Sequence, residues 1–324
     1  MKTFNHVNAS SVQEAIELLK SSGGAAQAMA GGTDLLGILK DRILPEYPET
    51  IINLKTIGDL EYVKEDETGL RLGGLTKLED IAQSQVIGSK YGIIAEAAKT
   101  VASPQIRNLG TLGGNLCQDV RCLFYRYPHQ IGGRLLCKRK GKGPCLAVKG
   151  DNRYSAIIGA KGCFAAFPSD MAIALAAMKA KILTAGQDGD RSILVEEFYD
   201  ASGHILGASE IMTGVQFPHP PEGEKTTFIK FRVRDAIDFA IVSVASALTL
   251  SKGMCRESRI FLGAMAPVPL RATEAEAYLK GKKITRENAE QAAFLAFEGS
   301  KSLSMNAYKI HIAKKLIIQS IMSA

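Results

Sequence analysis

The sequence lacks tryptophan, and aromatic residues make up only 6% of its 324 residues. It also lacks a long hydrophobic run, because the longest, FAIVSVASALTL at 239–250, has 12 residues, whereas a membrane-spanning helix needs about 20. The first residues, MKTFNHVNASSVQEAIELLK, contain no apolar stretch of the kind found in secretory signals. We therefore expect a cytoplasmic protein, in which cysteines remain reduced thiols.

Several motifs of catalysis and nucleotide binding are also missing. The five histidines are scattered, and neither a Ser/His/Asp set nor an H-E-x-x-H pattern stands out. Neither G-x-G-x-x-G nor G-x-x-x-x-G-K-[ST] occurs, which leaves a Rossmann or P-loop site unsupported. The cysteines form no C-x2-C pair, so the zinc-ribbon and bacterial ferredoxin spacings are absent too. These absences argue against a hydrolytic site and leave the cysteines as the main candidates for a functional site.

Five of the six cysteines lie within 47 residues, and only Cys255 lies elsewhere. The five are Cys117, Cys122, Cys137, Cys145 and Cys163. Residues 120–165 contain ten basic residues and one acid, a local charge of +9, which leaves −2 for the rest of a chain whose total is +7. This segment has little periodicity, so a bound group would have to organise it. An iron–sulfur cluster or a structural zinc would do so; the alternative is a set of metal-free thiols.

Two glycine-rich segments, AGGTDLL at 30–36 and GTLGGNL at 110–116, each follow an apolar stretch and carry small polar side chains. Glycine allows backbone N–H groups to approach an anion closely and tolerates positive φ. The two segments could therefore hold one diphosphate from two sides. The other interpretation is that each segment is an ordinary turn.

Local patterns predict a mixed α and β chain. A helix over 11–22 begins with the capping pair Ser11 and Glu14, a hairpin spans 60–75, and two helices over 286–299 and 306–322 close the chain. Three prolines make 217–224 the best linker, which predicts one domain over 1–217 and another over 225–324. In KFRVRDAIDF, alternate Lys and Arg side chains predict one cationic strand face.

Four motifs resemble those of the FAD-binding medium subunit of the xanthine dehydrogenase and carbon monoxide dehydrogenase family. They are AGGTDLL at 30–36, TLGGNLCQD at 111–119, PSDMAIAL at 168–175 and KFRVRDAIDF at 230–239. The cysteine-rich insert, above all NLCQDVRCLFY at 115–125, is similar to that of the β subunit of 4-hydroxybenzoyl-CoA reductase, which carries an extra [4Fe–4S] cluster. The resemblance implies an α+β, PCMH-type (vanillyl-alcohol-oxidase-like) two-subdomain FAD-binding fold, with the insert at about 117–163 and a small C-terminal α+β domain.

The resemblance also implies residue roles. The two glycine segments would wrap the FAD diphosphate, Val101 and Leu123 would pack nearby, Asp170 would bond the ribityl or ring region, and Lys230 would lie near the flavin. The residues implied for the diphosphate are Met29, Ala30, Gly31, Gly32, Thr33, Asp34, Leu35, Leu36, Thr111, Leu112, Gly113, Gly114 and Asn115. The implied cluster ligands are Cys122, Cys137, Cys145 and Cys163. No residue of this chain would act on the substrate.

The implied function is electron transfer within a molybdenum-containing reductase, with 4-hydroxybenzoyl-CoA reductase as the expected enzyme. The partners would be a molybdopterin-binding large subunit and a [2Fe–2S] small subunit in a heterohexamer-like complex. An acidic ferredoxin would donate electrons at the basic insert. One alternative is the FAD subunit of a molybdenum hydroxylase that reduces NAD+ and holds a structural zinc. The other is a basic nucleic-acid-binding or scaffold module.

Overall fold

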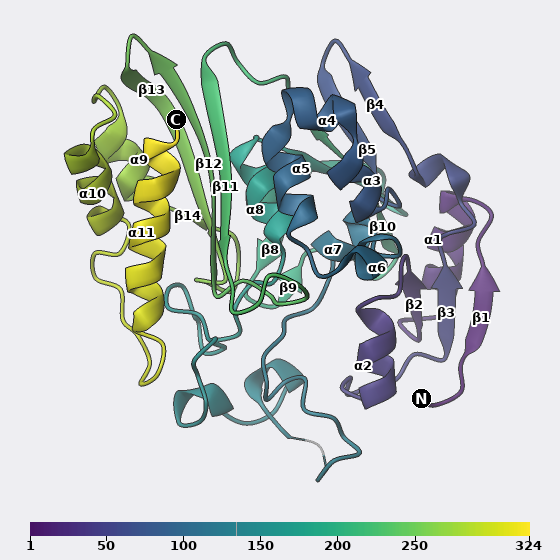
Figure 1. The fold of residues 1–324 in the computed structure, drawn as a ribbon. Coiled ribbons are helices and arrows are strands. Elements are labelled where there is room, and N and C mark those ends of the chain that lie inside the picture. The colour runs from purple at the N-terminus through teal and green to yellow at the C-terminus, as the bar shows by residue number, and fades with distance from the viewer. Residues whose placement is uncertain (134) are drawn as a thin grey trace.

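The computed structural model describes residues 1–133 and 135–324 (Figure 1). Helices and strands form three layered parts, and a loop-rich segment between α7 and α8 lies below the sheets in Figure 1. The mixed α and β content predicted from the sequence is confirmed. No helix of the described residues is both long enough and apolar enough to span a bilayer.

The N-terminal part is a small parallel sheet in the order β1-β3-β2, flanked by two helices. Its elements are β1 (Asn5–Asn8), α1 (Val12–Ser21), β2 (Ala26–Met29), α2 (Leu35–Asp41) and β3 (Thr50–Asn53). The Ser11 side chain accepts a hydrogen bond from the backbone N–H of Glu14, so the predicted helix start is correct. Because β2 ends at Met29, the first glycine segment lies at the carboxyl edge of this sheet, directly before α2.

The second part is a five-stranded antiparallel sheet in the order β4-β5-β10-β6-β7 with several short helices. Its strands are β4 (Val63–Asp66), β5 (Gly69–Gly73), β6 (Lys181–Gly186), β7 (Arg191–Leu194) and β10 (Glu210–Phe217), with a separate hairpin of β8 (Tyr199–Asp200) and β9 (Gly203–His204). Its helices are α3 (Leu78–Gln83), α4 (Gln85–Lys90), α5 (Gly92–Lys99), α6 (Pro104–Arg107), α7 (Leu112–Leu116) and α8 (Asp170–Ala177), and the 3-10 turns are η1 (Gly58–Leu60) and η4 (Val195–Glu197). Helix α8 is buried along its whole length and forms the centre of the largest apolar core.

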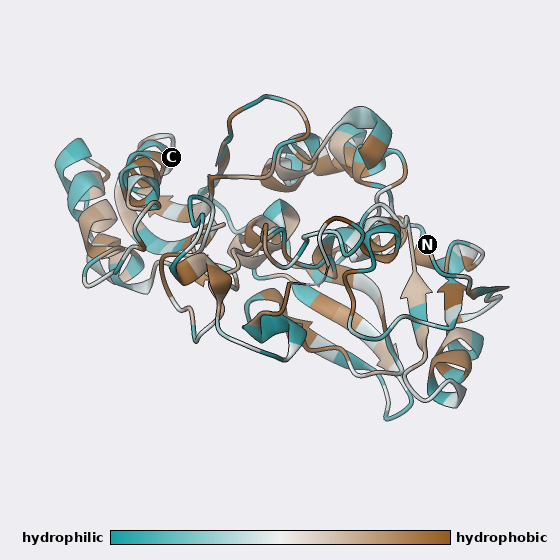
Figure 2. Ribbon diagram, turned by 90° about the horizontal axis from the view of Figure 1, so that it is seen from below, coloured by the Kyte–Doolittle hydropathy of each residue, from teal (hydrophilic) through white to brown (hydrophobic). Residues whose placement is uncertain are grey.

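The C-terminal part is an antiparallel sheet in the order β11-β12-β13-β14, and three helices cover one face of it (Figure 1). Its elements are β11 (Glu224–Phe231), β12 (Val242–Ser251), β13 (Met254–Gly263), β14 (Leu270–Arg271), α9 (Thr273–Leu279), α10 (Arg286–Leu295) and α11 (Tyr308–Met322). Hydrophilic residues gather on the outer turns of α10 in Figure 2, whereas Ala289, Ala292 and Ala293 are buried, and the helix packs against α9 and α11. The pattern had predicted α10 and α11 but not α9.

The cysteine-rich insert connects α7 to α8 and contains no strand among its described residues. Two 3-10 turns, η2 (Lys138–Lys140) and η3 (Leu146–Val148), are its only helical elements in the part of the chain that the structure describes. Its apolar cluster is small and combines Val120, Tyr125 and Cys137 with Ile38 and Ile43, which belong to or follow α2. The insert therefore packs against α2 of the N-terminal part, next to the first glycine segment.

A buried lysine in α11, Lys309, bonds this helix to the last part of the insert, near Ser155. The Lys309 ammonium is fully buried, and its Nζ donates to the backbone carbonyls of Ser155 at 3.0 Å and Ala264 at 2.6 Å. Asn306, also buried, donates to the Ser155 carbonyl at 3.2 Å. Burial lowers the pKa of Lys309 to about 7, because carbonyl dipoles replace only part of the lost hydration.

This buried lysine predicts a pH-dependent stability. Between pH 7 and 10 the unfolded chain binds a proton at Lys309 that the folded chain releases, so the free energy of unfolding should rise with pH over that window. One unit of pKa difference corresponds to about 1.4 kcal/mol. The change in the pKa of Lys309 from 10.5 to about 7 therefore corresponds to a full effect on the free energy of unfolding on the order of 5 kcal/mol. Urea unfolding of the isolated chain at pH 7 and pH 9.5, compared with Lys309→Met, isolates this contribution. An equal pH slope in both chains would contradict the assignment.

One strand prediction is wrong. Lys230, Arg232 and Arg234 do not share a solvated strand face, because β11 ends at Phe231. The Lys230 side chain is only 3% exposed, whereas the Arg234 side chain is 72% exposed and pairs with Asp238 at 2.6 Å. The chain leaves the sheet between these residues, so the alternation continues in sequence but not in space.

Candidate functional site

The two glycine segments face one cavity of about 480 Å³, which we call the glycine-loop cavity. The first segment reaches it from the end of β2 and the second from the start of α7. Ten of the residues implied for FAD line it, namely Met29, Ala30, Gly31, Gly32, Thr33, Asp34, Leu35, Thr111, Gly113 and Gly114. Residues 29–35 and 111–114, from two distant segments of the chain, thus line one space, as expected if both hold one ligand.

The glycines are required by the close approach of the two segments. A Cβ on Gly31 would lie 2.0 Å from the carbonyl oxygen of Leu109, just before the second segment. Gly32 has a φ of +73°, which favours glycine over other residues. The backbone N–H of Gly113 donates to the Gly74 carbonyl at 2.8 Å, which fixes the second segment to the end of β5. The cavity wall is therefore a backbone cradle that any larger residue would disturb.

The remaining residues implied for FAD lie outside the lining of this cavity. Leu36, Val101, Leu112, Asn115, Leu123, Asp170 and Lys230 are not among its lining residues. Asn115 is buried, and its side-chain oxygen accepts a hydrogen bond from the Ser169 hydroxyl at 2.7 Å. It therefore joins α7 to the start of α8 rather than facing this space.

Asp170 and Lys230 form a buried ion pair. Lys230 Nζ lies 2.7 Å from Asp170 Oδ2, and both side chains are less than 7% exposed. The other Asp170 oxygen accepts from the Ser243 hydroxyl at 2.9 Å, and Lys230 also donates to the Thr100 carbonyl at 3.0 Å. The pair stands next to the turn that contains Val101 and connects α8 to the C-terminal sheet. Its role toward the flavin remains a prediction.

Asp34, in the first glycine segment, is bound by residues of the insert. Its carboxylate pairs with Arg121 Nη1 at 2.7 Å and Arg126 Nη2 at 2.9 Å, and it accepts from the backbone N–H of Asp119 at 2.9 Å. Burial lowers the pKa of Arg121 to about 10, and the Asp34 charge opposes that shift. These three contacts tie the insert to the wall of the glycine-loop cavity.

The four cysteines implied as cluster ligands line one narrow cavity, which we call the cysteine cavity. Cys122, Cys137, Cys145 and Cys163 come from four separate stretches of the insert and meet there. Burial raises the pKa of Cys122, and the neighbouring Cys163 and Cys145 add to that shift. In the part of the chain that the structure describes, no group of three or more His, Cys, Asp or Glu side chains is arranged to hold a single metal ion.

Cys117 differs from these four. It lines the glycine-loop cavity, not the cysteine cavity. Burial raises its pKa to about 12, so its thiol stays protonated at neutral pH. The sixth cysteine, Cys255, is buried in the C-terminal core. The structure therefore separates the cysteines into a set of four and two others.

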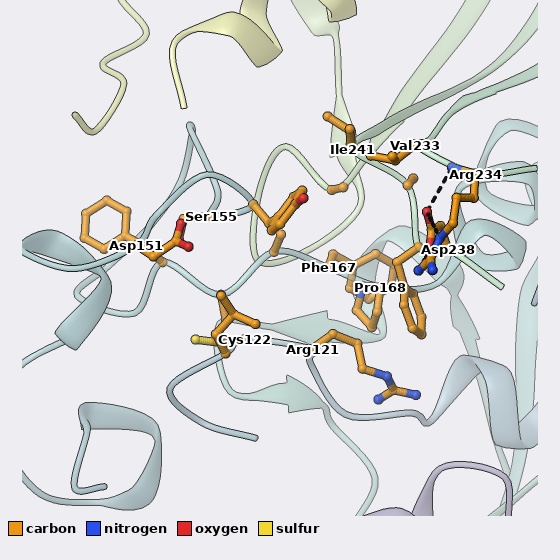
Figure 3. Close-up of a pocket in the computed structure, with 18 residues that line it drawn as sticks. Arg121, Cys122, Asp151, Ser155, Phe167, Pro168, Val233, Arg234, Asp238 and Ile241 are labelled. Carbon is orange, nitrogen blue, oxygen red and sulfur yellow. Dashed lines mark hydrogen bonds and ion pairs between the residues drawn. The ribbon is translucent and has the colours of Figure 1, made fainter. Parts of the chain in front are cut away.

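A third cavity of about 380 Å³ lies between the insert and the loop after β11 (Figure 3). Phe167, Val233 and Ile241 contribute apolar walls, and Cys122 also borders it. Figure 3 shows the Arg121 side chain extending away from the Cys122 sulfur, and its guanidinium stacks over Phe239 at 4.8 Å. Leu123 lines this cavity rather than the glycine-loop cavity.

Sequence analysis missed the polar residues between the glycine-loop cavity and the cysteine cavity. The Asp119 carboxylate pairs with Arg139 Nη2 at 2.8 Å and accepts a hydrogen bond from the Tyr125 hydroxyl. The Arg139 guanidinium also stacks on the Tyr125 ring at 5.5 Å. The one available signal was that Asp119 is an acid at the edge of a strongly basic segment. Its partners follow it by 6 and 20 residues in a region without periodicity, so spacing did not reveal them.

The family comparisons agree with this architecture. Residues 2–220 match the family described as the FAD binding domain in molybdopterin dehydrogenase. Residues 227–324 match the family described as the CO dehydrogenase flavoprotein C-terminal domain. Together the two matches cover nearly the whole chain.

Individual relatives show the same similarity along their full lengths. The chain is 31% identical over 325 aligned positions to the FAD-binding subunit of an aldehyde oxidoreductase from Escherichia coli, covering 98% of this chain and 96% of that protein. It is 27% identical to the carbon monoxide dehydrogenase medium chain of Afipia carboxidovorans, covering 91% of this chain and 85% of that one. The solved carbon monoxide dehydrogenase of Hydrogenophaga pseudoflava has a chain that superposes with a TM-score of 0.79 at 25% identity, over 100% of this chain and 97% of that one.

These matches confirm the expected fold class, a FAD-binding domain of mixed helices and strands followed by a C-terminal α+β domain. The glycine segments that line the 480 Å³ cavity lie within the FAD-binding match. The close approach of Gly31 to Leu109 and of Gly113 to Gly74 holds both segments at the wall of this cavity.

Proposed function

The chain belongs to the family of FAD-binding subunits of molybdenum hydroxylases and dehydrogenases, and we propose that it transfers electrons through a second redox group, a [4Fe–4S] cluster, besides FAD. The family makes it an oxidoreductase subunit in which FAD is the electron-transfer group. The observation that carries the proposal is the meeting of four separated cysteines at one cavity within the insert. This family membership leaves the nucleic-acid or scaffold alternative without support.

We propose that FAD lies in the glycine-loop cavity. Backbone N–H groups of the first glycine segment would face its diphosphate, whereas those of residues 112–115 in the second segment already donate within the protein. Thr33 and Thr111 add hydroxyls to the same lining. Asp34 would not contact the phosphates directly, because Arg121, Arg126 and the Asp119 N–H already occupy its carboxylate. Its role is to hold the first segment in shape, and a paired carboxylate also repels the diphosphate less than a free one.

We propose a cluster rather than a single zinc for the cysteine cavity. A cubane cluster separates its four thiolates, since each sulfur binds a different corner, whereas four ligands of one zinc lie close together. The four cysteines share one cavity, so each could bind a different corner of a cubane. Lys138 and Arg139 also line this cavity and would offset the negative charge of a thiolate-bound cluster.

When bound, the cluster would supply single-electron transfer, and FAD would supply both single and paired transfer. The chain itself would hold these groups in fixed positions, and substrate chemistry would occur on a partner. Relatives named as medium chains or FAD-binding subunits support a role within an assembly. We propose a molybdopterin-binding large subunit and a [2Fe–2S] small subunit as the partners.

For the whole enzyme we propose reductive dehydroxylation of an aromatic acyl-CoA, as in 4-hydroxybenzoyl-CoA reductase, with electrons from ferredoxin. The support is the NLCQDVRCLFY motif and the cysteine set at 122, 137, 145 and 163. A second candidate is aldehyde oxidation, favoured by the 31% identity to the FAD-binding subunit of an aldehyde oxidoreductase. The pocket that decides between them would lie on the large subunit.

The test is anaerobic purification of the chain with its natural partners. We expect FAD and about four iron atoms per chain beyond those of the [2Fe–2S] subunit, with a flavin band and a broad iron–sulfur shoulder in the absorbance spectrum. Flavin with zinc and no such iron would support the NAD+-linked alternative. Turnover of 4-hydroxybenzoyl-CoA with reduced ferredoxin, against turnover of aromatic aldehydes with an artificial acceptor, separates the two candidate reactions.

The charge of the insert predicts where ferredoxin docks. Lys142, Lys149 and Lys161 are exposed, whereas Arg139 is mostly enclosed by its partners and Lys140 is buried. Changing the three exposed lysines to glutamate should slow reduction by ferredoxin about tenfold at low salt and reduce the salt dependence, because steering by opposite charges is screened by ions. Stopped-flow reduction at 20 mM and 300 mM salt measures this.

A matched control lies on the opposite end of the molecule. Lys280, Lys282 and Lys283 follow α9 in the C-terminal domain, and the same three changes there keep the net charge equal to that of the insert variant. If both triple variants slowed the reaction equally, the total charge rather than the insert would determine the rate.

A further inference from the structure

Two side chains form the wall between the two proposed cofactor sites. Among the described residues, Tyr125 and Arg139 are the only ones that line both the glycine-loop cavity and the cysteine cavity. Tyr125 is 6% exposed and the Arg139 side chain 11% exposed. A group placed in either cavity would therefore have this pair as its nearest shared neighbour, screened from bulk water.

Arg139 is held in this position from three directions. Its guanidinium donates to Asp119 Oδ1 from Nε at 3.2 Å and from Nη2 at 2.8 Å. It donates to the carbonyls of Ala201 at 3.2 Å and Ser202 at 2.7 Å, which belong to the turn between β8 and β9. It also lies over the Tyr125 ring at 5.5 Å. A guanidinium stays charged at any pH a protein meets, so this is a fixed positive charge.

The Tyr125 ring separates the two cavities, and its hydroxyl donates to Asp119 Oδ2. The same carboxylate thus receives the arginine on one oxygen and the phenol on the other. Asp119 is in turn fixed to the first glycine segment, because its backbone N–H donates to Asp34. The Arg139 cation and the Asp119 anion therefore have positions tied to both sites, and the Lys140 ammonium adds a second cation 5.7 Å from the Tyr125 ring centroid.

On the basis of the proposed function, we propose that Arg139 is a positioning residue shared by both sites. Its charge raises the reduction potentials of both FAD and the [4Fe–4S] cluster, and the charge of Asp119 partly offsets this effect. Each cofactor gains negative charge on reduction, and a nearby cation in a poorly solvated wall stabilises that charge. One residue would then keep the two potentials matched, because any change in its charge moves both in the same direction.

The proposal predicts opposite signs for two neighbouring substitutions. Arg139→Gln should lower both midpoint potentials, whereas Asp119→Asn should raise both. For the cluster we expect an effect of about tenfold in the equilibrium constant for accepting an electron, which is 59 mV for a one-electron couple. Arg139→Lys keeps the charge and should stay near the wild-type potentials. Tyr125→Phe keeps the ring and both charges and should shift them little.

The experiment is a redox titration of the assembled complex, following FAD by absorbance and the cluster by electron paramagnetic resonance, after iron and flavin analysis of each variant. Shifts of opposite sign for the two substitutions, in both cofactors, are the expected result. Full iron and flavin with potentials that do not move, or that move in one direction for both variants, would overturn this inference and leave the proposed function intact. A wild-type chain without cluster iron would overturn both.

Discussion

Cys122→Ser should lose the cluster iron while keeping FAD. A serine hydroxyl is a far weaker ligand than a thiolate, and Cys122 shares its cavity with only three other cysteines, so nothing nearby can replace it. We expect iron attributable to this chain to fall from about four atoms to less than about one, with loss of the iron–sulfur shoulder. The FAD content should stay within about a fifth of the wild-type value, because the glycine-loop cavity does not include Cys122. Iron analysis and absorbance of the purified complex measure both.

The matched control is Cys255→Ser, the same change at a cysteine of the C-terminal core. It alters stability but touches neither cavity, so it should keep the iron. Cys117→Ser adds a second comparison within the insert, since Cys117 lines the glycine-loop cavity and should affect flavin rather than iron. Unchanged iron in Cys122→Ser, or equal loss in Cys255→Ser, would remove Cys122 from the ligand set.

Sequence reasoning succeeded where a residue type has few uses. Clustered cysteines that form no disulfides have few uses besides metal binding or redox chemistry, and the four singled out do share one cavity. Glycine pairs after apolar strands predicted close backbone approach, and Gly31 and Gly32 show it. The elements with strong local signals, such as the Ser11 cap and the hairpin of β4 and β5, were also correct.

It could not identify partners where the partner, rather than the residue type, decides the contacts of a side chain. Asp34 looks like a phosphate-loop residue in sequence, but its carboxylate is taken up by Arg121 and Arg126, about 90 positions later. Lys230 was assigned to a strand face and instead is buried against Asp170, 60 positions away. Such pairings depend on how distant segments meet in the fold. A single sequence supplies the charges but not which of them will lie together.

The close approach of the glycine segments predicts a large effect from one methyl group. Gly31→Ala would place a Cβ 2.0 Å from the Leu109 carbonyl oxygen and 2.9 Å from its carbon. These are backbone atoms that cannot rotate away, and Leu109 precedes Gly110, whose carbonyl accepts from the Leu78 N–H. The two segments must therefore move apart, and the cradle for the diphosphate opens. We expect FAD affinity to fall by at least about 100-fold, which is about 2.7 kcal/mol.

The control is Gly37→Ala, the same change six residues later within α2, where an added Cβ meets nothing within 4 Å. Alanine there should leave FAD affinity unchanged and stabilise the helix by up to about 1 kcal/mol. Titration of the flavin-free chain with FAD, followed by the quenching of flavin fluorescence, gives both dissociation constants, and thermal unfolding reports whether each variant folds. Because a folded Gly31→Ala chain with wild-type FAD affinity would mean that the segments do not need to touch, that result would place FAD outside the glycine-loop cavity.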